Sequence, residues 1–518
     1  MAVEEELGAP THKQTATYSL TEQAITVAGR LTRRERRGFR GGAACGGAGR
    51  GQAGPMSSFA PVPIATAPGL PLVGNLFDIR RDRLGLHMRC VMNADITKLK
   101  LAWRRAWVIG ASPLAHQVLV EDADAFVKAP GLAAFGRPLL GRGLLTADGD
   151  DHRRQRKLMA PAFAPKRMAG YADVMAGRAA IAADHLRPGA TIDLSEEMMA
   201  LTLDIVGRTL FDVDLAGEAR AVADALTVAM EYIISSITAP LPYSWPLPRN
   251  RKLRAAIARL DEIVLRIIAD RRTRTADRGD VLSILLEAKD DDGSGLSDRE
   301  LRDEIMTLML AGHETTANLL AWTWAELART PDVRERLEVE LDTVLGERAP
   351  TYADLPRLPY TLAILEESLR LYPPAYVVAR EAKRALTIGE AKIEPRDVVL
   401  VAIRAMQRRP DYWPDPDRFD PTRFLGDSAG ARGRRVGYLP FGAGPRVCIG
   451  NHFALAEAQL ILATWAQRFR FRLVRPGPID PEPLVTLRPL GGVHVVVEPR
   501  APRPDRVASR PQGPQLVE

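Results

Sequence analysis

A long, mostly apolar helix is the feature that most limits how this chain can fold. The residue pattern predicts that it begins at Asp298 and ends at Arg329, because Pro331 cannot continue it. Ser297 and Glu300 form a capping box at its start. The 518 residues, 46% of them hydrophobic, are enough for a large core in one big domain or in two to three ordinary ones.

Other segments extend the mainly helical pattern. Helices are also expected within residues 168–330, 358–372 and 454–469, and short strands at 99–101, 107–110, 398–403 and 493–497, with a turn at 104–105 between the first two. The Gly- and Pro-interrupted segment 130–147 is expected to be a loop, and 411–424, dense in Pro and Asp, cannot be regular. The sequence therefore predicts a mainly α fold with small β-sheets.

Charge and cysteine content exclude several classes of protein. The formal net charge is +7, and +3 of it lies in residues 1–55, so nucleic-acid binding is not expected. Cys45, Cys90 and Cys448 lie far apart without a CxxC pair, which argues against a disulfide scaffold or a zinc site and fits a reducing compartment. No apolar run is long enough to span a bilayer, and the N-terminus lacks a secretory signal.

The two ends of the chain have compositions that favour disorder. Residues 1–55 combine an arginine cluster with a Gly/Ala-rich stretch, and residues 501–518 are rich in Pro and Arg. We expect both to be flexible tails. Met56 opens a stretch that reads like a natural start, which favours a non-native origin for the first 55 residues; a functional basic arm is the alternative.

A glycine-rich loop, residues 441–450, surrounds the last cysteine. Phe441 lies seven positions before Cys448, Arg446 lies two before it, and Gly450 two after it. A thiolate needs positive charge and backbone donors nearby, and Arg446 and the glycines offer both. Haem iron held by a thiolate gains electron density that favours O–O cleavage. For a lone cysteine, a buried and inert position in a turn is the commoner case.

Polar residues interrupt the middle of the long helix at 311–316, Ala-Gly-His-Glu-Thr-Thr. Buried polar groups are costly unless they are satisfied, and Thr hydroxyls bond to carbonyls one turn back and can bend a helix. Such interruptions often mark functional sites. In isolation, a kinked core helix with a satisfied Thr is the simpler interpretation.

These segments together resemble the cytochrome P450 family. The cysteine loop meets every fixed position of the family's haem-binding pattern, Phe-x-x-Gly-x-Arg-x-Cys-x-Gly, and 311–315 match its distal motif, Ala-Gly-x-(Asp/Glu)-Thr. Glu367 and Arg370 match its Glu-x-x-Arg motif, and Arg423 is the candidate third member of that network, although Thr422 departs from the family's usual Glu. The resemblance covers nearly all of residues 60–500 and implies the P450 fold, a single large domain over 56–500 with haem b between the long helix and the cysteine loop.

The resemblance also assigns roles to residues. Cys448 would be the axial iron ligand, His152 and Arg156 would bind one haem propionate and Arg380 the other. The haem-binding set implied in this way is His152, Arg156, Arg380, Phe441, Arg446, Cys448 and Gly450. Glu367, Arg370 and Arg423 would form a buried structural network.

On the distal side the resemblance makes Thr315 the hydroxyl next to oxygen and Glu314 the acid that supplies it with protons. Gly312 would leave room for dioxygen, and His313 would face away from the iron. The substrate would contact residues that are almost all apolar, so a small apolar substrate such as a fatty acid or terpenoid is expected. The predicted substrate contacts are Ala311, Ala375, Tyr376, Val377, Val485 and Thr486.

The predicted activity is a haem-thiolate monooxygenase that inserts one atom of O2 into a C–H bond. The chain has no flavin or iron–sulfur motif, so electrons would come from a ferredoxin or flavodoxin with its reductase. Arg432, Arg434 and Arg435 would attract an acidic partner or serve solubility. A cytoplasmic monomer is expected. The alternatives are a haem-thiolate peroxygenase or isomerase, against which Thr315 and Glu314 argue, and a non-enzymatic haem sensor.

Overall fold

The computed structural model describes residues 64–500 except 240, 274–279, 290–292 and 427–435. The predictions for residues 1–55 and 501–518, and for Arg432, Arg434 and Arg435, lie outside the described residues. The described residues all belong to one unit of the chain. None of the helices that they form has the length and apolar character needed to cross a bilayer.

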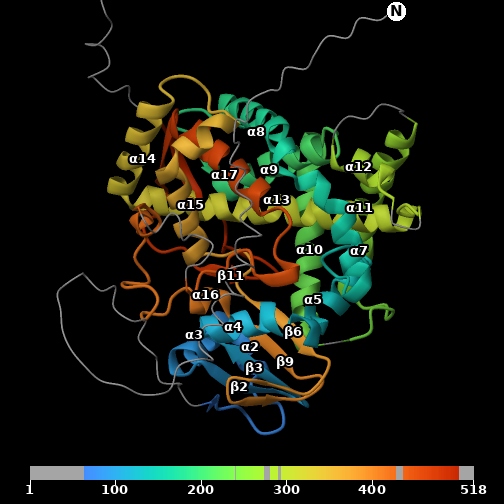
Figure 1. Ribbon diagram of the computed structural model, residues 1–518. Helices are drawn as coiled ribbons and strands as arrows, with labels where there is room; N and C mark the ends of the chain where they lie inside the picture. The colour runs from blue at the N-terminus through green and yellow to red at the C-terminus, as the bar shows by residue number, and fades with distance from the viewer. Residues whose placement is uncertain (1–63, 240, 274–279, 290–292, 427–435, 501–518) are drawn as a thin grey trace, which may run out of the picture. The chain divides into compact units, whose positions relative to one another are not determined.

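Helices make up most of the described chain (Figure 1). The α-helices are α2 (Leu76–Arg81), α3 (Arg83–Asn93), α4 (Ser112–His116), α5 (Pro130–Phe135), α6 (Arg137–Leu140), α7 (Gly149–Met159), α8 (Pro165–His185), α9 (Leu194–Leu210), α10 (Ala219–Thr238), α11 (Pro248–Arg272), α12 (Val281–Glu287), α13 (Asp298–Arg329), α14 (Pro331–Val344), α15 (Pro359–Leu371), α16 (Ile403–Met406) and α17 (Asn451–Ala466). Shorter turns are the π-helical η1 (Gln117–Glu121) and the 3-10 helices η2 (Ala123–Ala125), η3 (Ala160–Phe163), η4 (Ala216–Glu218), η5 (Tyr352–Arg357), η6 (Pro421–Phe424) and η8 (Gly444–Arg446).

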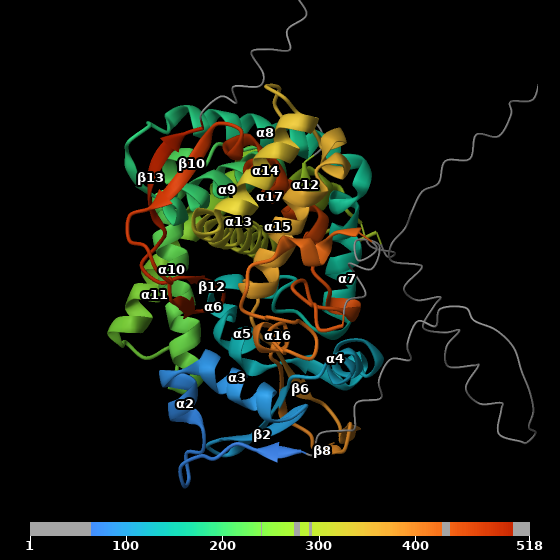
Figure 2. The same cartoon turned by 90° about the vertical axis from the view of Figure 1, so that its left-hand side faces the viewer.

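The long helix α13 runs through the middle of the helical part, as Figures 1 and 2 both show. Its 32 residues span about 48 Å. It has the bounds predicted from the sequence: the Ser297 hydroxyl accepts from the Glu300 N–H (3.3 Å), the Glu300 carboxylate accepts from the Ser297 N–H (2.8 Å), and Pro331 begins α14. The helices α9, α11, α15 and α17 pack around it, together with the strands β10 (Phe469–Leu473) and β12 (Leu487–Pro489).

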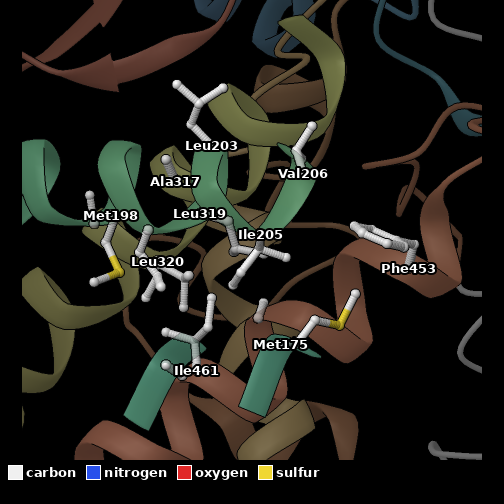
Figure 3. Close-up of a cluster of buried hydrophobic side chains, with 14 of the residues drawn as sticks. Met175, Met198, Leu203, Ile205, Val206, Ala317, Leu319, Leu320, Phe453 and Ile461 are labelled. Carbon is white, nitrogen blue, oxygen red and sulfur yellow. The ribbon is translucent and has the colours of Figure 1, made fainter. Parts of the chain in front are cut away.

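The largest hydrophobic cluster joins α8, α9 and α17 to α13 (Figure 3). Met175 of α8, Ile205 and Val206 of α9, Leu320 of α13 and Ile461 of α17 are each at most 1% exposed. Most of α13 is buried on every side, so neighbouring elements must cover it around its circumference. These contacts provide that cover and fix the position of α13 against the helix that follows the cysteine loop.

The strands form four small sheets. They are β1 (Ala65–Thr66), β2 (Ile96–Leu101), β3 (Arg104–Ile109), β4 (Phe126–Lys128), β5 (Thr191–Asp193), β6 (Val378–Ala382), β7 (Leu386–Ile388), β8 (Ala391–Ile393), β9 (Val398–Val401), β10 (Phe469–Leu473), β11 (Pro481–Pro483), β12 (Leu487–Pro489) and β13 (His494–Pro499). The largest sheet has the order β1-β2-β3-β9-β6-β4, and its last pair sets Lys128 opposite Arg380. The others are β10-β13-β5, β11-β12 and β7-β8.

Two local predictions were wrong. The turn between β2 and β3 lies at residues 102–103 and not at 104–105, because Ala102 takes a positive φ of 54° and lets the chain reverse there. The segment 130–147 is not only a loop, since it contains α5 and α6. Each of these helices has a proline in its first turn, where the missing N–H costs nothing.

A buried ion-pair network fixes the end of α15. Arg370 donates to Glu367 through both Nε and Nη2 (2.7 Å each), and neither side chain is exposed. Arg423 Nε lies 3.4 Å from Glu367 Oε1, which also accepts from the Asp420 N–H (2.9 Å). Arg370 donates three further bonds to backbone carbonyls in the segment 407–418. The structure thus brings the three residues of the predicted network together.

Replacing Arg370 with leucine would leave the Glu367 carboxylate buried without its main partner. We expect the free energy of unfolding to fall by about 3–5 kcal/mol, measured by chemical denaturation of the full chain. Arg472 pairs with Glu498 at the surface, and Arg472→Leu is the control, with an expected change of about 0–1 kcal/mol. Equal effects of the two substitutions would contradict the structural role of Arg370.

Candidate active site

The glycine-rich loop before α17 is closed by its own backbone. The Cys448 N–H donates to the Phe441 carbonyl (3.0 Å), and the Val447 N–H donates to the Gly444 carbonyl (3.0 Å). Gly444 has a φ of 71°, and a Cβ there would lie 1.9 Å from the Leu119 carbonyl oxygen. Only glycine allows this approach, so the loop is held against η1 in one position.

Cys448 has accessible surface, but its thiol is surrounded by enough protein to oppose its ionisation. Burial raises the pKa of the Cys448 thiol, and the Gly450 N–H and the charge of Arg156 lower it without offsetting the burial. Arg156 is held beside the loop because its Nη1 donates to the Val447 carbonyl (2.7 Å). A thiolate at this position therefore needs a further positive charge, such as a metal ion.

The prediction that Arg446 supplies charge to the sulfur does not agree with the structure. Arg446 Nη2 donates to Asp148 Oδ1 (2.9 Å) and to the Phe126 carbonyl (3.0 Å), and Nη1 donates to the Ala123 carbonyl (3.3 Å). Its guanidinium is thereby engaged with an acid and the chain around η2. The arginine that acts on the sulfur is Arg156, from a helix almost 300 positions earlier.

The metal-binding side chains among the described residues indicate whether the loop fits a haem. They contain no group of three or more His, Cys, Asp or Glu side chains that could hold a metal ion together. A metal bound by Cys448 must therefore bring most of its own ligands, as an iron porphyrin does. The donor set of this loop, one sulfur and no companion ligand, fits that group.

Arg380 is a buried cation without an acidic partner. It is 9% exposed, no described carboxylate lies within 4.0 Å of it, and its Nη1 donates to the Ala379 carbonyl (3.1 Å). Burial, with the nearby charge of Arg446, lowers the pKa of Arg380 to about 10. Lys128, opposite it in the sheet, donates to carbonyls of the segment 144–147, and burial lowers its pKa to about 8. Among the described residues, Asp148 and Glu304 are the acids that act on these cations, and burial raises the pKa of Glu304 to about 7, so the region holds more positive charge than they can balance.

The helix α7 adds two side chains to this region. It carries His152 and Arg156 one turn apart on one face. Burial, followed by the charges of Lys128 and Arg446, lowers the pKa of His152 to about 4, so its ring is neutral near pH 7 and can donate a hydrogen bond. A neutral donor and unbalanced cations fit the two carboxylates of a haem, which is where the sequence predicted that His152, Arg156 and Arg380 would bind.

The middle of α13 is accessible only over a short stretch. Between Leu301 and Leu327 the helix is buried, apart from an exposed Ala311 and half-buried positions at Arg302, Gly312 and Thr315. The helix is continuous through this stretch, and the Thr315 hydroxyl donates to the Ala311 carbonyl one turn back (2.7 Å). The predicted distal residue therefore lies on the open side of the helix.

Two expectations about this stretch have different outcomes. A Cβ on Gly312 would lie 2.9 Å from Val206 Cγ2, so this glycine serves the close approach of α9 to α13, and the prediction that it leaves room for dioxygen is not supported. His313 lies 2.6 Å from the Met309 carbonyl through Nδ1, and the Thr202 hydroxyl of α9 donates to the His313 carbonyl (3.0 Å). Burial lowers the pKa of His313 to about 4, so this side chain is a neutral core histidine.

Glu314 is a buried carboxylic acid with a perturbed pKa. It is 1% exposed, its Oε1 accepts a bond from the Thr486 hydroxyl, and its Oε2 has no partner among the described residues. Burial raises the pKa of Glu314 to about 7, against the opposing effects of the Thr486 bond, the charge of Arg488 and the Asn318 amide. A group that titrates near neutral pH can both give and take a proton.

The predicted substrate contacts fall into two groups. Four have accessible surface, namely Ala311, Ala375, Val377 and Val485. Tyr376 is 3% exposed, and its hydroxyl donates to the Leu484 carbonyl (2.9 Å) and accepts from Arg83 (3.1 Å), so it is part of the scaffold and not a substrate contact. Thr486 is 9% exposed and donates its hydroxyl proton to Glu314, so its hydroxyl is engaged within the protein, and its contact with the substrate stays a prediction.

Sequence reasoning missed two polar residues near α13. Asn318, one turn after Glu314, joins its network, and the four-residue spacing could have indicated this. Glu457 of α17 is fully buried, and burial raises its pKa well above the usual range. Thr316 lies beside it but donates to the Gly312 carbonyl (3.3 Å), so neither oxygen of Glu457 has a donor among the described residues. A glutamate inside an apolar helix was the available signal.

Comparison with known proteins gives consistent matches. The family model of cytochrome P450 matches residues 65–496. Cyclooctatin synthase of Streptomyces melanosporofaciens is 39% identical over 437 residues, which cover 83% of this chain and 95% of that protein. Cyclooctat-9-en-7-ol 5-monooxygenase of the same organism is 38% identical over 463 residues (87% and 99%). Pentalenene oxygenase of Streptomyces avermitilis is 33% identical over 427 residues (82% and 94%).

Replacing Cys448 with alanine would remove the only sulfur of the glycine-rich loop. We expect the reduced, haem-loaded protein to lose the thiolate-type absorption band of its carbon monoxide complex, measured as a difference spectrum. Cys90 is buried, and burial raises its pKa to about 11, so Cys90→Ala is the matched control and keeps the band. A thiolate band that survives in Cys448→Ala would show that another group holds the iron.

Proposed function

The chain belongs to the cytochrome P450 family, and we propose that this member oxidises terpenoid compounds with Glu314 and Thr315 as its proton-delivery pair. It is a haem b protein and a haem-thiolate monooxygenase, which inserts one oxygen atom of O2 into a hydrophobic substrate with electrons from a separate redox partner. The observation that carries the proposal is the short accessible stretch of α13, where Thr315 follows directly on an acid whose pKa is raised to about 7.

The haem, when bound, supplies the activation of dioxygen and the oxidation of the C–H bond. In our proposal Cys448 holds the iron, while His152, Arg156 and Arg380 bind the propionates. Arg446, with its bond to Asp148, and Phe441 and Gly450 would keep the loop in shape for the same group. These assignments are supported by the lone sulfur and by the unbalanced positive charge around β4 and β6.

Thr315 and Glu314 would manage protons on the opposite side. The Thr315 hydroxyl lies at the accessible stretch, where it can hold a water molecule or accept a proton. Glu314 precedes Thr315 in the sequence and lies on the buried side of α13, and its carboxyl is partly protonated near neutral pH. The pair therefore joins a titrating acid to a surface that the substrate and oxygen can reach.

The substrate class follows from the accessible apolar residues and from the names of the relatives. Ala311, Ala375, Val377 and Val485 offer no charge and no hydrogen-bonding side chain, which fits a hydrocarbon-like substrate. The names of two matched proteins describe oxidation of cyclooctat-9-en-7-ol and of pentalenene. A terpenoid is therefore favoured over a fatty acid, because a fatty acid carries a carboxylate that these four residues cannot pair.

We further propose that the electron donor is a ferredoxin or flavodoxin with its reductase, because the sequence contains no flavin or iron–sulfur motif. A monomeric, cytoplasmic enzyme with a catalytic domain over residues 56–500 is part of the same proposal. The family match over residues 65–496 supports the domain limits.

A spectral screen tests the substrate class. We expect pentalenene or another terpenoid to shift the haem absorption of the full-length protein toward the high-spin form, because substrate displaces the water on iron, whereas palmitic acid and testosterone give small shifts. The measurement is a titration of the absorption difference for each compound. A large shift with palmitic acid alone would overturn the terpenoid assignment.

The pH dependence of product formation tests Glu314. Because its raised pKa keeps the carboxyl protonated below about pH 7, we expect the fraction of reductant converted to product to fall as the pH rises through 7. The Gln side chain of Glu314→Gln cannot ionise, so this variant loses the fall in product fraction near pH 7, which we call the pH limb. Its product formation also drops by on the order of 10²-fold. Glu457→Gln is the control and keeps the limb, because no hydrogen bond among the described residues joins Glu457 to Glu314 or Thr315. A limb unchanged in Glu314→Gln would contradict the assignment.

A further inference from the structure

The turn between β11 and β12 lies against the middle of α13 and is fixed from several sides. Arg83 donates to the Pro483 carbonyl (2.7 Å), and the Tyr376 hydroxyl donates to the Leu484 carbonyl (2.9 Å). On the following strand, Trp322 Nε1 of α13 donates to the Leu487 carbonyl (3.3 Å). The turn therefore has little freedom to move relative to α13.

This fixed turn delivers one hydroxyl group to Glu314. Asn318 Nδ2 donates to Thr486 Oγ1 (3.4 Å), and the Thr486 hydroxyl donates its one proton to Glu314 Oε1. Asn318 and Glu314 are each 1% exposed, and Thr486 is 9% exposed. Water has little access to this chain of bonds, so the donor that Glu314 meets is set by the protein.

The Thr486 hydroxyl determines where the Glu314 carboxyl points. The other carboxyl oxygen, Oε2, is buried and has no partner among the described residues. Arg488 of β12 is the one charged group of the described chain that affects Glu314, and it is already tied to Glu482 (2.7 Å) and to Thr227 of α10 (3.3 Å). Without the Thr486 hydroxyl, neither oxygen would have a neutral donor from outside α13.

We propose that Thr486 is a positioning residue for the reaction, which acts through Glu314 and not through the substrate. The inference rests on the proposed role of Glu314 as the acid that supplies protons. Thr486 holds the carboxyl by its hydroxyl, and Asn318 orients that hydroxyl. Val485, next to it in the turn, has accessible surface and remains the substrate contact, so adjacent residues of one turn have separate tasks.

Thr486→Val removes the hydroxyl and keeps the shape of the side chain. Because a donor to a carboxylate favours its charged form, its loss raises the pKa of Glu314, and we expect the pH limb of product formation to move up by roughly one pH unit. The yield of product per reductant falls by roughly 3- to 30-fold, with peroxide formed instead. Thr486→Ser keeps a hydroxyl and restores both readings to wild-type values.

The measurements use the full-length haem protein with a surrogate ferredoxin and its reductase. The probe is pentalenene if it shifts the haem spectrum, and otherwise the screened compound with the largest shift. Three quantities are recorded for each variant: the spectral dissociation constant, the product yield per reductant and the pH limb. Val485→Ala is the matched control, because it is expected to raise the spectral dissociation constant without shifting the pH limb of product formation.

The outcomes separate the possible roles of Thr486. A changed dissociation constant in Thr486→Val with an unchanged limb and yield would make Thr486 a substrate contact and overturn the inference. A wild-type limb in Glu314→Gln would instead overturn the proposed role of Glu314. If Thr486→Val does not incorporate haem, Asn318→Leu removes the amide that orients the hydroxyl, and the same upward shift of the limb is expected, with an unmoved limb counting against the inference.

Discussion

The charge on one sulfur is the constraint on which the rest of this structure depends. Burial disfavours the Cys448 thiolate, and only one backbone N–H and the charge of Arg156 favour it. The iron of a haem supplies the missing positive charge, but it brings two propionate carboxylates with it. In our proposal Arg380, which has no carboxylate partner among the described residues, would balance one of those carboxylates, and the neutral His152 would donate a hydrogen bond to them. The positions of β4, β6 and α7 around the loop can thus be understood as consequences of binding a single anionic ligand atom inside the protein.

The helix α13 solves a second problem, because it carries polar residues through a hydrophobic core. Each polar side chain in its middle is directed to a different side: His313 to its own preceding turn beside α9, Glu314 to the β11–β12 turn, and Thr316 to the Gly312 carbonyl. The bonds from Thr202 to the His313 carbonyl and from Thr486 to Glu314 join α13 to α9 and to the β11–β12 turn, and so fix the rotation of the helix about its axis. The same rotation leaves Thr315 on the accessible side, where we propose that it acts.

Local signals in the sequence predicted the helices and strands, whereas the side-chain roles that were predicted wrongly depend on contacts between distant parts of the chain. The capping residues and Pro331 give the bounds of α13 because they act within one turn of its ends. The partner of Arg446 is an acid 298 positions away, so no local pattern could reveal that this guanidinium is already engaged. Gly312 was misinterpreted for the same reason, because the side chain that leaves no room for a Cβ at this position, Val206, belongs to α9. Motif spacing identifies which residues matter, but it does not say which atoms they touch.

Glu314 and Glu457 are both buried beside the middle of α13, but their environments differ. Neither oxygen of Glu457 has a donor among the described residues, and burial raises the pKa of Glu457 well above its usual range against the weaker effect of Thr316. An acid delivers protons repeatedly only if it can both lose and regain its proton in each cycle. Glu314 is equally buried, but the Thr486 hydroxyl, Arg488 and Asn318 bring its pKa back to about 7, where both forms are populated. The donors from the β11–β12 hairpin and the next turn of α13, and not the depth of burial, therefore distinguish Glu314 from Glu457 and suit it to the role that we propose.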